Sequence, residues 1–306
     1  MTTRQPNDGS KTPQDVTGKV QVGTVRMGIV GAGGRGASFR TAINLLEDVQ
    51  VTALCDPNEP QLAKCGEEFG VDEEAQFTDY ETMIEAGIVN AVVLATPMPL
   101  HVPQAVAALR LDIAVLSEVP AGVSIEECRE LVEAVEASKA TYMMAENYPY
   151  TRPNQIVGEM VRRGEFGEVY YAEGEYIHEL KDLLVKTPWR REWAAGINGV
   201  TYGTHSLGPI LQWFAGQRVT RVCGVGSGTR HGDADGGLFE NEATCLMLCR
   251  TSNDGLIKIR VDMISDRPHA TRNYQLQGMD GVYESARAPG EAKDRKSTRL
   301  NSSHYS

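Results

Sequence analysis

A glycine-rich turn between an apolar run and a helical pattern constrains this chain more than any other feature. Residues 31–36 read Gly-Ala-Gly-Gly-Arg-Gly, a G-x-G-x-x-G that directly follows the apolar run Val25–Val30. Asp56 lies 20 residues after Gly36, at the end of a second apolar run, Val51–Cys55. A strand, a glycine turn, a helix and a second strand ending in an acidic residue together predict a dinucleotide-binding unit.

Each position of this motif has a physical role in holding a pyrophosphate. Gly31 permits the tight turn, Gly33 lets the backbone approach the phosphates, and Gly36 lets the helix pack closely on the strand. The helix N-terminus adds N–H donors and the positive end of its dipole. We expect Asp56 to bind the adenosine ribose and to repel a 2′-phosphate, which favours NAD over NADP. Arg35 is predicted to line the same site, where its charge could weaken that preference.

The alternation of strands and helices continues to residue 147. Three further apolar runs end in loops: Ala91–Ala95, Ile113–Leu116 and Tyr142–Ala145. The segments between them have helical spacing, and two begin with capping boxes, Ser124 with Glu127 and Thr78 with Glu81. Strands that alternate with helices predict a doubly wound parallel sheet with right-handed crossovers. Residues 25–147 are therefore predicted to form a Rossmann domain that binds NAD.

The pattern changes after residue 147. Five strand patterns follow without long helices between most of them: Glu168–His178, Arg218–Gly226, Ala243–Arg250, Leu256–Met263 and Asn273–Gln277. Helical patterns cover only Asn154–Arg163, which Gly164 closes, and roughly His205–Phe214. This pattern predicts a second, α+β domain over residues 148–293, with a mostly antiparallel open sheet.

Composition excludes several classes of function. The net charge of −11 argues against a nucleic-acid partner, because proteins that coat phosphates are usually basic. No apolar run approaches the roughly 18 residues of a membrane span. The first 24 residues are polar and lack the apolar core of a secretion signal. We therefore expect a disordered tail at 1–24 in a cytoplasmic protein without a membrane partner.

The other end of the chain has an unusual composition. The eleven residues from Asp294 to His304 read DRKSTRLNSSH, which resembles the in-frame translation of a common sequencing adapter. We interpret residues 294–306 as such an artefact rather than as a genuine polar tail, and we expect them to form no regular structure. The natural chain is then expected to continue past Lys293, so that the second domain is incomplete here.

No metal site is predicted. The six cysteines form no C-x-x-C pair, and Cys245 and Cys249 lie on one strand pattern about 13 Å apart, too far to share a metal. Buried free thiols in a reducing compartment are the simpler interpretation. The segment 231–237, HGDADGG, fits a solvated turn better than a ligand set. His231 and His269 are interpreted as surface residues.

Four motifs of the first half resemble a known family. GIVGAGGRG, CDP, ATPMPLH and SEVPAG are similar to the N-terminal domain of the Gfo/Idh/MocA oxidoreductases, and the resemblance covers essentially residues 25–290. It implies a Rossmann domain, then an α/β domain whose open sheet carries the substrate site and often an oligomer interface. NAD, a sugar or polyol substrate and a homo-oligomer built through the C-terminal sheet are implied with it.

One triplet departs from most dehydrogenases of that family. They have Glu-Lys-Pro where this chain has Glu118-Val119-Pro120, and a valine can neither polarise a hydroxyl nor move a proton. The segments GEYIHEL (174–180), Trp189-Arg190 and TYGTHSLGP (201–209) resemble glycoside hydrolase family 109, which shares the Glu-Val-Pro triplet. Gly203 stands where that family has proline, which leaves the rigidity of this loop open.

The second resemblance implies a set of site residues. The cofactor would be lined by Thr96, Met98, His101, Glu118, Val119 and Asn147. The sugar would meet Tyr176, Tyr202 and His205, with His178 nearby. Each of these four also has a structural alternative, because tyrosines often fill cores and a lone histidine is often only structural. For His178 the two roles are equally compatible with its strand pattern.

Three functions remain open at this point. The first is NAD-dependent oxidation of a sugar or polyol. The second, implied by the family 109 resemblance, is glycoside hydrolysis, in which NAD takes and returns a hydride at C3 and a base removes the C2 proton. Histidine suits such a base, and tyrosine hydroxyls suit a developing enolate. The third is a catalytically silent NAD-binding protein, which the missing lysine permits and the Tyr176, Tyr202 and His205 set opposes.

Overall fold

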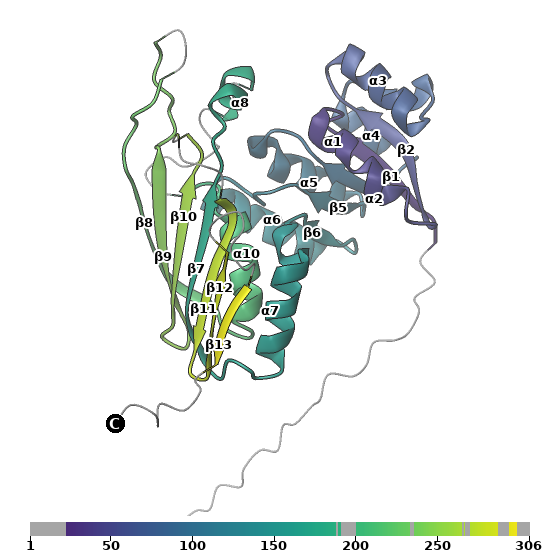
Figure 1. Ribbon diagram of the computed structural model, residues 1–306. Coiled ribbons are helices and arrows are strands. Elements are labelled where there is room, and N and C mark those ends of the chain that lie inside the picture. The colour runs from purple at the N-terminus through teal and green to yellow at the C-terminus, as the bar shows by residue number, and fades with distance from the viewer. Residues whose placement is uncertain are drawn as a thin grey trace, which may run out of the picture.

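The computed structural model describes residues 23–187, 189–190, 200–232, 236–264, 266, 270–286 and 294–298. Within these ranges the strands form two sheets that belong to two successive parts of the chain (Figure 1). Residues 1–22 of the predicted tail lie outside the described ranges, as do Asp233, Asp235 and His269. No helix in the described part of the chain is long and apolar enough to cross a membrane.

The first part is a parallel sheet of six strands in the order β3-β2-β1-β4-β5-β6, which confirms the predicted doubly wound fold. Its strands are β1 (Val25–Val30), β2 (Val49–Cys55), β3 (Gln76–Phe77), β4 (Ala91–Leu94), β5 (Ala114–Ser117) and β6 (Tyr142–Met144). The helices between them are α1 (Gly34–Ser38), α2 (Arg40–Ile43), α3 (Glu59–Phe69), α4 (Tyr80–Glu85), α5 (His101–Arg110) and α6 (Ile125–Ala137). Short 3-10 turns lie at η1 (Glu73–Ala75) and η2 (Met98–Leu100).

Burial explains why the central strand of this sheet is a continuous apolar run. All four residues of the central strand β4 are buried, because helices cover both faces of the sheet. Two hydrophobic clusters result. One contains Val92 and Leu94, and the other contains Ile29 and Val93. Alternate residues of one strand therefore supply two different cores.

The two predicted capping boxes have different outcomes. Ser124 caps α6 as predicted, because its hydroxyl accepts a hydrogen bond from the Glu127 N–H at 3.1 Å. The box of Thr78 and Glu81 is wrong. The N-cap of α4 is Asp79, whose carboxylate accepts hydrogen bonds from the N–H and the hydroxyl of Thr82 at 2.8 and 2.6 Å. A carboxylate at the helix start caps as well as a hydroxyl does, and the helix begins one residue later than the box implied.

The second part is a sheet of seven strands in the order β13-β12-β11-β7-β10-β9-β8. All neighbours are antiparallel except β7 and β10, so the mostly antiparallel sheet is confirmed. The strands are β7 (Val169–Ile177), β8 (Val219–Gly226), β9 (Thr244–Thr251), β10 (Leu256–Asp262), β11 (Ala270–Gly278), β12 (Gly281–Ser285) and β13 (Asp294–Thr298). The helical segments are η3 (Tyr148–Tyr150), α7 (Arg152–Arg162), α8 (Lys181–Lys186) and α10 (Thr204–Trp213).

Helix α10 packs on the face of this sheet that is turned toward the first part of the chain (Figure 1). Gly174 on β7 makes the contact possible, because a Cβ there would lie 2.5 Å from the carbonyl oxygen of Ser206. Strand alternation places Glu173, Glu175 and Lys258 on the opposite face. Charged and polar side chains line that open face, where Lys258 Nζ lies 2.8 Å from the Glu173 carboxylate.

Residues 294–298 contradict the expectation that the polar end of the chain forms no regular structure. They form strand β13, which pairs with β12 in antiparallel register. Without β13, the outer edge of β12 would leave N–H and C=O groups unpaired. Because strands pair through backbone hydrogen bonds, a polar segment can fill this position. Residues 299–306 lie outside the described ranges. The origin of the segment stays a prediction.

The cysteine prediction holds for four of the six thiols. Cys55, Cys65, Cys245 and Cys249 are buried and free, and burial raises the pKa of each of these thiols. Cys128 and Cys223 are free but exposed, so the prediction of burial is wrong for them. Cys223 lies on β8, which is the last strand of this sheet among the residues that the structure describes.

Candidate active site

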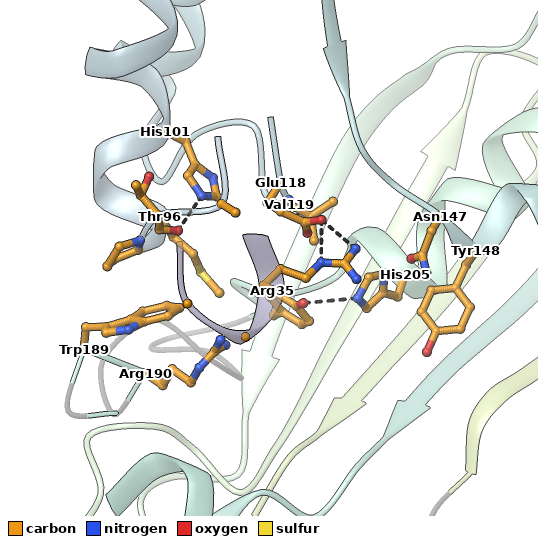
Figure 2. A pocket seen from close by; sticks show the side chains of 16 residues that line it. Arg35, Thr96, His101, Glu118, Val119, Asn147, Tyr148, Trp189, Arg190 and His205 are labelled. Atoms are coloured by element: carbon orange, nitrogen blue, oxygen red, sulfur yellow. Dashed lines mark hydrogen bonds and ion pairs between the residues drawn. The ribbon is translucent and has the colours of Figure 1, made fainter. Parts of the chain in front are cut away.

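A cavity of about 400 Å³ opens where strands β1, β4, β5 and β6 end (Figure 2). This is the carboxyl edge of the parallel sheet, where open α/β sheets bind ligands. The first part of the chain lines it with Gly33, Gly34, Arg35, Ala95, Thr96, Pro97, Met98, His101, Glu118, Val119 and Asn147. The second part lines it with Tyr148, Trp189, Arg190, Tyr202 and His205. The cavity therefore joins the nucleotide-binding motif to residues predicted to meet a substrate.

The three glycines of the motif occupy three different environments. Gly31 has a φ of +86°, and a Cβ there would lie 2.7 Å from the carbonyl oxygen of Ala95. A Cβ on Gly36 would lie 2.0 Å from the carbonyl oxygen of Gly31. A Cβ on Gly33 would meet nothing within 4 Å. Gly31 and Gly36 thus shape the turn from behind, without lining the cavity, while Gly33 faces the open space that a pyrophosphate needs.

Asp56 follows the last residue of β2, outside the lining of the cavity. Its carboxylate accepts a hydrogen bond from the Asn58 N–H at 2.9 Å. Arg35 instead pairs with Glu118 at 2.6 Å, at the end of β5 (Figure 2). The sheet order β2-β1-β4-β5 separates the ends of β2 and β5 by three strand spacings, about 14 Å. This pairing holds the Arg35 charge away from the end of β2, so Arg35 is poorly placed to offset the repulsion of a 2′-phosphate by Asp56.

Six further residues expected to line the cofactor all line the cavity: Thr96, Met98, His101, Glu118, Val119 and Asn147. Their roles differ, because His101 is buried and tied on both sides. Its Nδ1 lies 2.8 Å from the Pro120 carbonyl oxygen and its Nε2 lies 2.9 Å from that of Thr96. His101 therefore joins the loops that follow β4 and β5. Met98 and Val119, both buried, give this wall an apolar surface.

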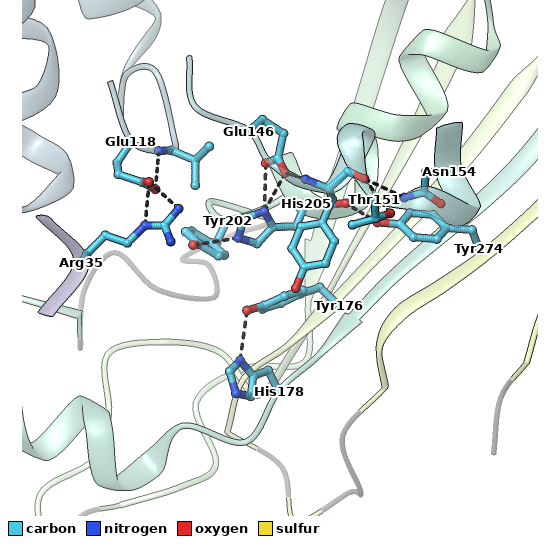
Figure 3. A network of polar contacts seen from close by, with 12 residues as sticks. Arg35, Glu118, Glu146, Thr151, Asn154, Tyr176, His178, Tyr202, His205 and Tyr274 are labelled. Carbon is cyan, nitrogen blue, oxygen red and sulfur yellow. Dashed lines mark hydrogen bonds and ion pairs between the residues drawn. The ribbon is translucent and has the colours of Figure 1, made fainter. Parts of the chain in front are cut away.

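Two of the four predicted catalytic residues lie together at the cavity. The Tyr202 hydroxyl is 3.1 Å from His205 Nε2, and both residues come from the start of α10 or just before it (Figure 3). Tyr176 and His178 form a second pair outside the lining, with 3.0 Å between the hydroxyl and Nδ1. The rings of Tyr176 and His205 are 5.1 Å apart, so the two pairs are neighbours. Burial raises the pKa of both Tyr176 and Tyr202, which keeps their hydroxyl protons in place at neutral pH.

The sequence interpretation gave no site role to four residues found here. Glu146 contacts His205, Tyr148 lines the cavity, and Trp189 and Arg190 had entered only as part of a motif. The Arg190 guanidinium lies 4.2 Å from the Trp189 ring, and burial lowers its pKa. Its Nε atom is buried and has no hydrogen-bond partner among the described residues. Glu146 and Tyr148 flank Asn147 at the end of β6, so their position at the carboxyl edge was the available signal.

The residues at this cavity fit a bound NAD. Gly33 leaves open space at the N-terminus of α1, where no side chain caps the helix, and the backbone N–H groups there suit a phosphate. In the described part of the chain no cluster of His, Cys, Asp and Glu could hold a metal ion. Fold and site together define a two-domain enzyme class that binds a dinucleotide at the edge of a parallel sheet.

Comparison with known proteins gives the family. Residues 25–146 match the model of the Gfo/Idh/MocA oxidoreductase family with an NAD-binding Rossmann fold. Residues 155–284 match the Gfo/Idh/MocA C-terminal domain. The chain belongs to the Gfo/Idh/MocA oxidoreductase family, and its cofactor is NAD.

The relatives specify this further. The chain is 31% identical to a glycosyl hydrolase family 109 protein of Saccharopolyspora erythraea over 85% of its own length and 62% of that protein. It is 32% identical to one of Shewanella amazonensis, over 85% and 63%. The chain thus spans less than two thirds of these relatives. Its fold matches scyllo-inositol dehydrogenase from Lactobacillus casei with bound NAD(H) and scyllo-inositol, with a TM-score of 0.73, 19% identity and coverage of 90% and 82%.

Proposed function

We propose that this protein uses NAD to oxidise a hydroxyl-bearing carbon of a sugar or polyol. One observation carries the proposal: a single cavity connects the glycine motif to the Tyr202–His205 pair. Membership of an NAD-binding oxidoreductase family supports it. So does the matching fold of a dehydrogenase that holds NAD(H) and scyllo-inositol in its solved structure.

The residues of the chain supply binding and proton transfer. NAD supplies a hydride acceptor when bound. The Tyr202 hydroxyl can accept a hydrogen bond from the substrate hydroxyl while donating its own proton to His205 Nε2 at 3.1 Å. His205 then serves as the base that receives the proton released during oxidation. Asn147, Tyr148 and Arg190 add polar groups that suit a polyhydroxylated ligand (Figure 2).

A second candidate is NAD-assisted hydrolysis of a glycoside. Val119 favours it, because this buried, apolar side chain stands where most dehydrogenases of the family have lysine. The relatives at 31% and 32% identity, which carry the name glycosyl hydrolase family 109, favour it as well. In that chemistry the ketone formed at C3 acidifies the C2 proton, the glycosidic oxygen leaves by elimination, and water adds before the ketone is reduced again.

Absorbance of NADH at 340 nm separates the candidates. A dehydrogenase releases one NADH for each sugar or polyol oxidised and leaves aryl glycosides intact. A hydrolase cleaves aryl glycosides at constant NADH, and deuterium from solvent enters C2 of the released sugar. In either case His205→Ala is expected to lower the rate by about 10²–10⁴-fold, the usual cost of losing a general acid–base group. If a broad panel gives neither reaction, both proposals fail and the silent NAD-binding protein is favoured.

We also propose that the protein is a cytoplasmic homo-oligomer. Six free cysteines suit a reducing compartment. The open face of the second sheet carries exposed Leu248 and Val225 beside its charged centre, and no described helix covers it. Sedimentation should give the mass of more than one subunit for the wild type. Leu248→Glu should shift the measured mass toward that of a monomer. A wild-type monomer at micromolar concentration would contradict this proposal.

A further inference from the structure

One ion pair at the site is almost completely buried and involves a residue outside the cavity lining. Both carboxylate oxygens of Glu146 lie close to His205 Nδ1, at 2.8 and 2.9 Å (Figure 3). Both side chains are almost completely buried, at 6% and 10% exposure. The two residues are 59 positions apart and come from different parts of the chain. The contact therefore exists only because the end of β6 meets the start of α10.

The surroundings hold both partners in place. The Tyr148 N–H donates a hydrogen bond to Glu146 Oε1 at 3.0 Å. The Tyr274 hydroxyl donates to the backbone carbonyl of His205 at 2.6 Å. A Cβ on Gly208 would lie 2.9 Å from Glu146 Cγ, so this turn of α10 leaves room for the carboxylate. Turning the Glu146 side chain away would break its bonds to His205 and to the Tyr148 N–H of η3, while Tyr274 of β11 holds the backbone at His205.

This geometry dictates the tautomer of the histidine. A carboxylate only accepts hydrogen bonds, so the imidazole proton must sit on Nδ1. In the neutral ring Nε2 then carries the lone pair and accepts the Tyr202 proton at 3.1 Å. The carboxylate, the imidazole and the phenol are therefore joined by two successive hydrogen bonds. Tyr202 and His205 both line the cavity and Glu146 does not. Because the phenol occupies the Nε2 atom of His205, the phenol is the member of the three placed to meet the substrate.

We propose that Glu146 is a positioning residue, which fixes His205 in the Nδ1–H tautomer so that Tyr202 and His205 act as one proton relay toward the substrate. The role of this relay in turnover rests on the proposed function, whereas the assignment of the tautomer does not. When the substrate proton moves to Tyr202 and the phenol proton moves to Nε2, the imidazole becomes a cation. The buried negative charge of Glu146 stabilises that cation and keeps its Nδ1 proton in place.

Two readouts test this proposal on the full 306-residue protein. The first is ¹⁵N NMR of histidine-labelled protein at a pH where the ring is neutral, with the His205 signal identified by its loss in His205→Asn. The wild type should show a protonated Nδ1 and a bare Nε2, and Glu146→Gln should give a mixed or reversed tautomer. A neutral His205 protonated on Nε2 in the wild type would overturn the proposal, whether or not any substrate is turned over.

The second readout is steady-state kinetics on whichever substrate the wild type accepts. Glu146→Gln should lower kcat by about 10²-fold, within the range for acid–base groups, with KM and the NAD dissociation constant changed less than twofold. Glu146→Asp, which keeps the charge, should recover part of the rate. Glu175→Gln is the matched control, because it removes a buried carboxylate on the open sheet face and should leave kcat unchanged.

The outcomes separate failure of this inference from failure of the proposed function. Full kcat in Glu146→Gln would overturn the relay. Absence of turnover in the wild type would count against the proposed function alone, and the tautomer would still decide the role of Glu146. If Glu146→Gln does not fold, the wild-type tautomer and the Glu146→Asp kinetics still decide it.

Discussion

The glycine motif shows how far single residues could be interpreted from sequence. The roles expected for Gly31, Gly33 and Gly36 agree with their observed surroundings, because a fingerprint with fixed spacing determines which backbone atoms approach each other. Glu146 could not be found in this way. Its partner is 59 residues away, and no local pattern encodes a contact between two parts of the chain.

The contrast between two of these glycines gives a stability prediction. Gly36→Ala should lower the free energy of unfolding by about 1–3 kcal/mol, the usual cost of overpacking, because its Cβ would clash with the Gly31 carbonyl oxygen. Gly33→Ala should leave the free energy of unfolding unchanged and weaken NAD binding only. Urea unfolding of both variants measures this. Equal stability of Gly36→Ala and wild type would show that the turn is not packed as described.

Asp56 carries a prediction about cofactor choice. We expect NAD(H) to bind more tightly than NADP(H), because the carboxylate at the end of β2 repels a 2′-phosphate and Arg35 is engaged by Glu118. Asp56→Ala should lower the ratio of NAD(H) affinity to NADP(H) affinity by about tenfold. Calorimetric titration with both cofactors measures the ratio. Tighter binding of NADP by the wild type would refute the role given to Asp56.

At the scale of elements, periodicity located the long strands and helices, and missed those that depend on neighbours. Strands β12 and β13 were not predicted. Each has only five residues, and β13 pairs at the edge of the sheet, where a ladder needs little apolar content. The short helix α8 was missed as well, because one turn and a half carries little periodic signal. A local sequence pattern cannot specify which segment of the chain will pair with the open edge of a sheet.

The cap of α4 yields a pH-dependent prediction. Hydrogen bonds from Thr82 lower the pKa of Asp79 below its ordinary value. Such a carboxyl contributes stability that is fully present above the unfolded pKa of about 3.9 and is lost as the pH falls through the lower, folded pKa. Asp79→Ala should therefore lower Tm at pH 6, and the difference from wild type should shrink below pH 4. Thr78→Ala, the matched control, should leave Tm unchanged at both values.

At the scale of the whole molecule, the site exists because two folding units meet. The parallel sheet brings the ends of β1, β4, β5 and β6 to one edge, and the second unit adds Tyr202 and His205 from α10 and the loop before it. Neither unit alone carries all the groups that the proposed reaction needs. The motif resemblances pointed to both halves, while their meeting in one cavity needed the structure.

If the proposed function is right, turnover depends on hydride transfer to NAD in this cavity. The most direct test strips the protein of nucleotide, adds a sugar deuterated at the oxidised carbon, and follows product formation with and without added NAD. We predict no turnover without NAD, full recovery when it is restored, and deuterium on the cofactor in a single-turnover quench. Turnover that proceeds unchanged in nucleotide-free protein, or deuterium that never leaves the sugar for the cofactor, would show that NAD is not the hydride acceptor.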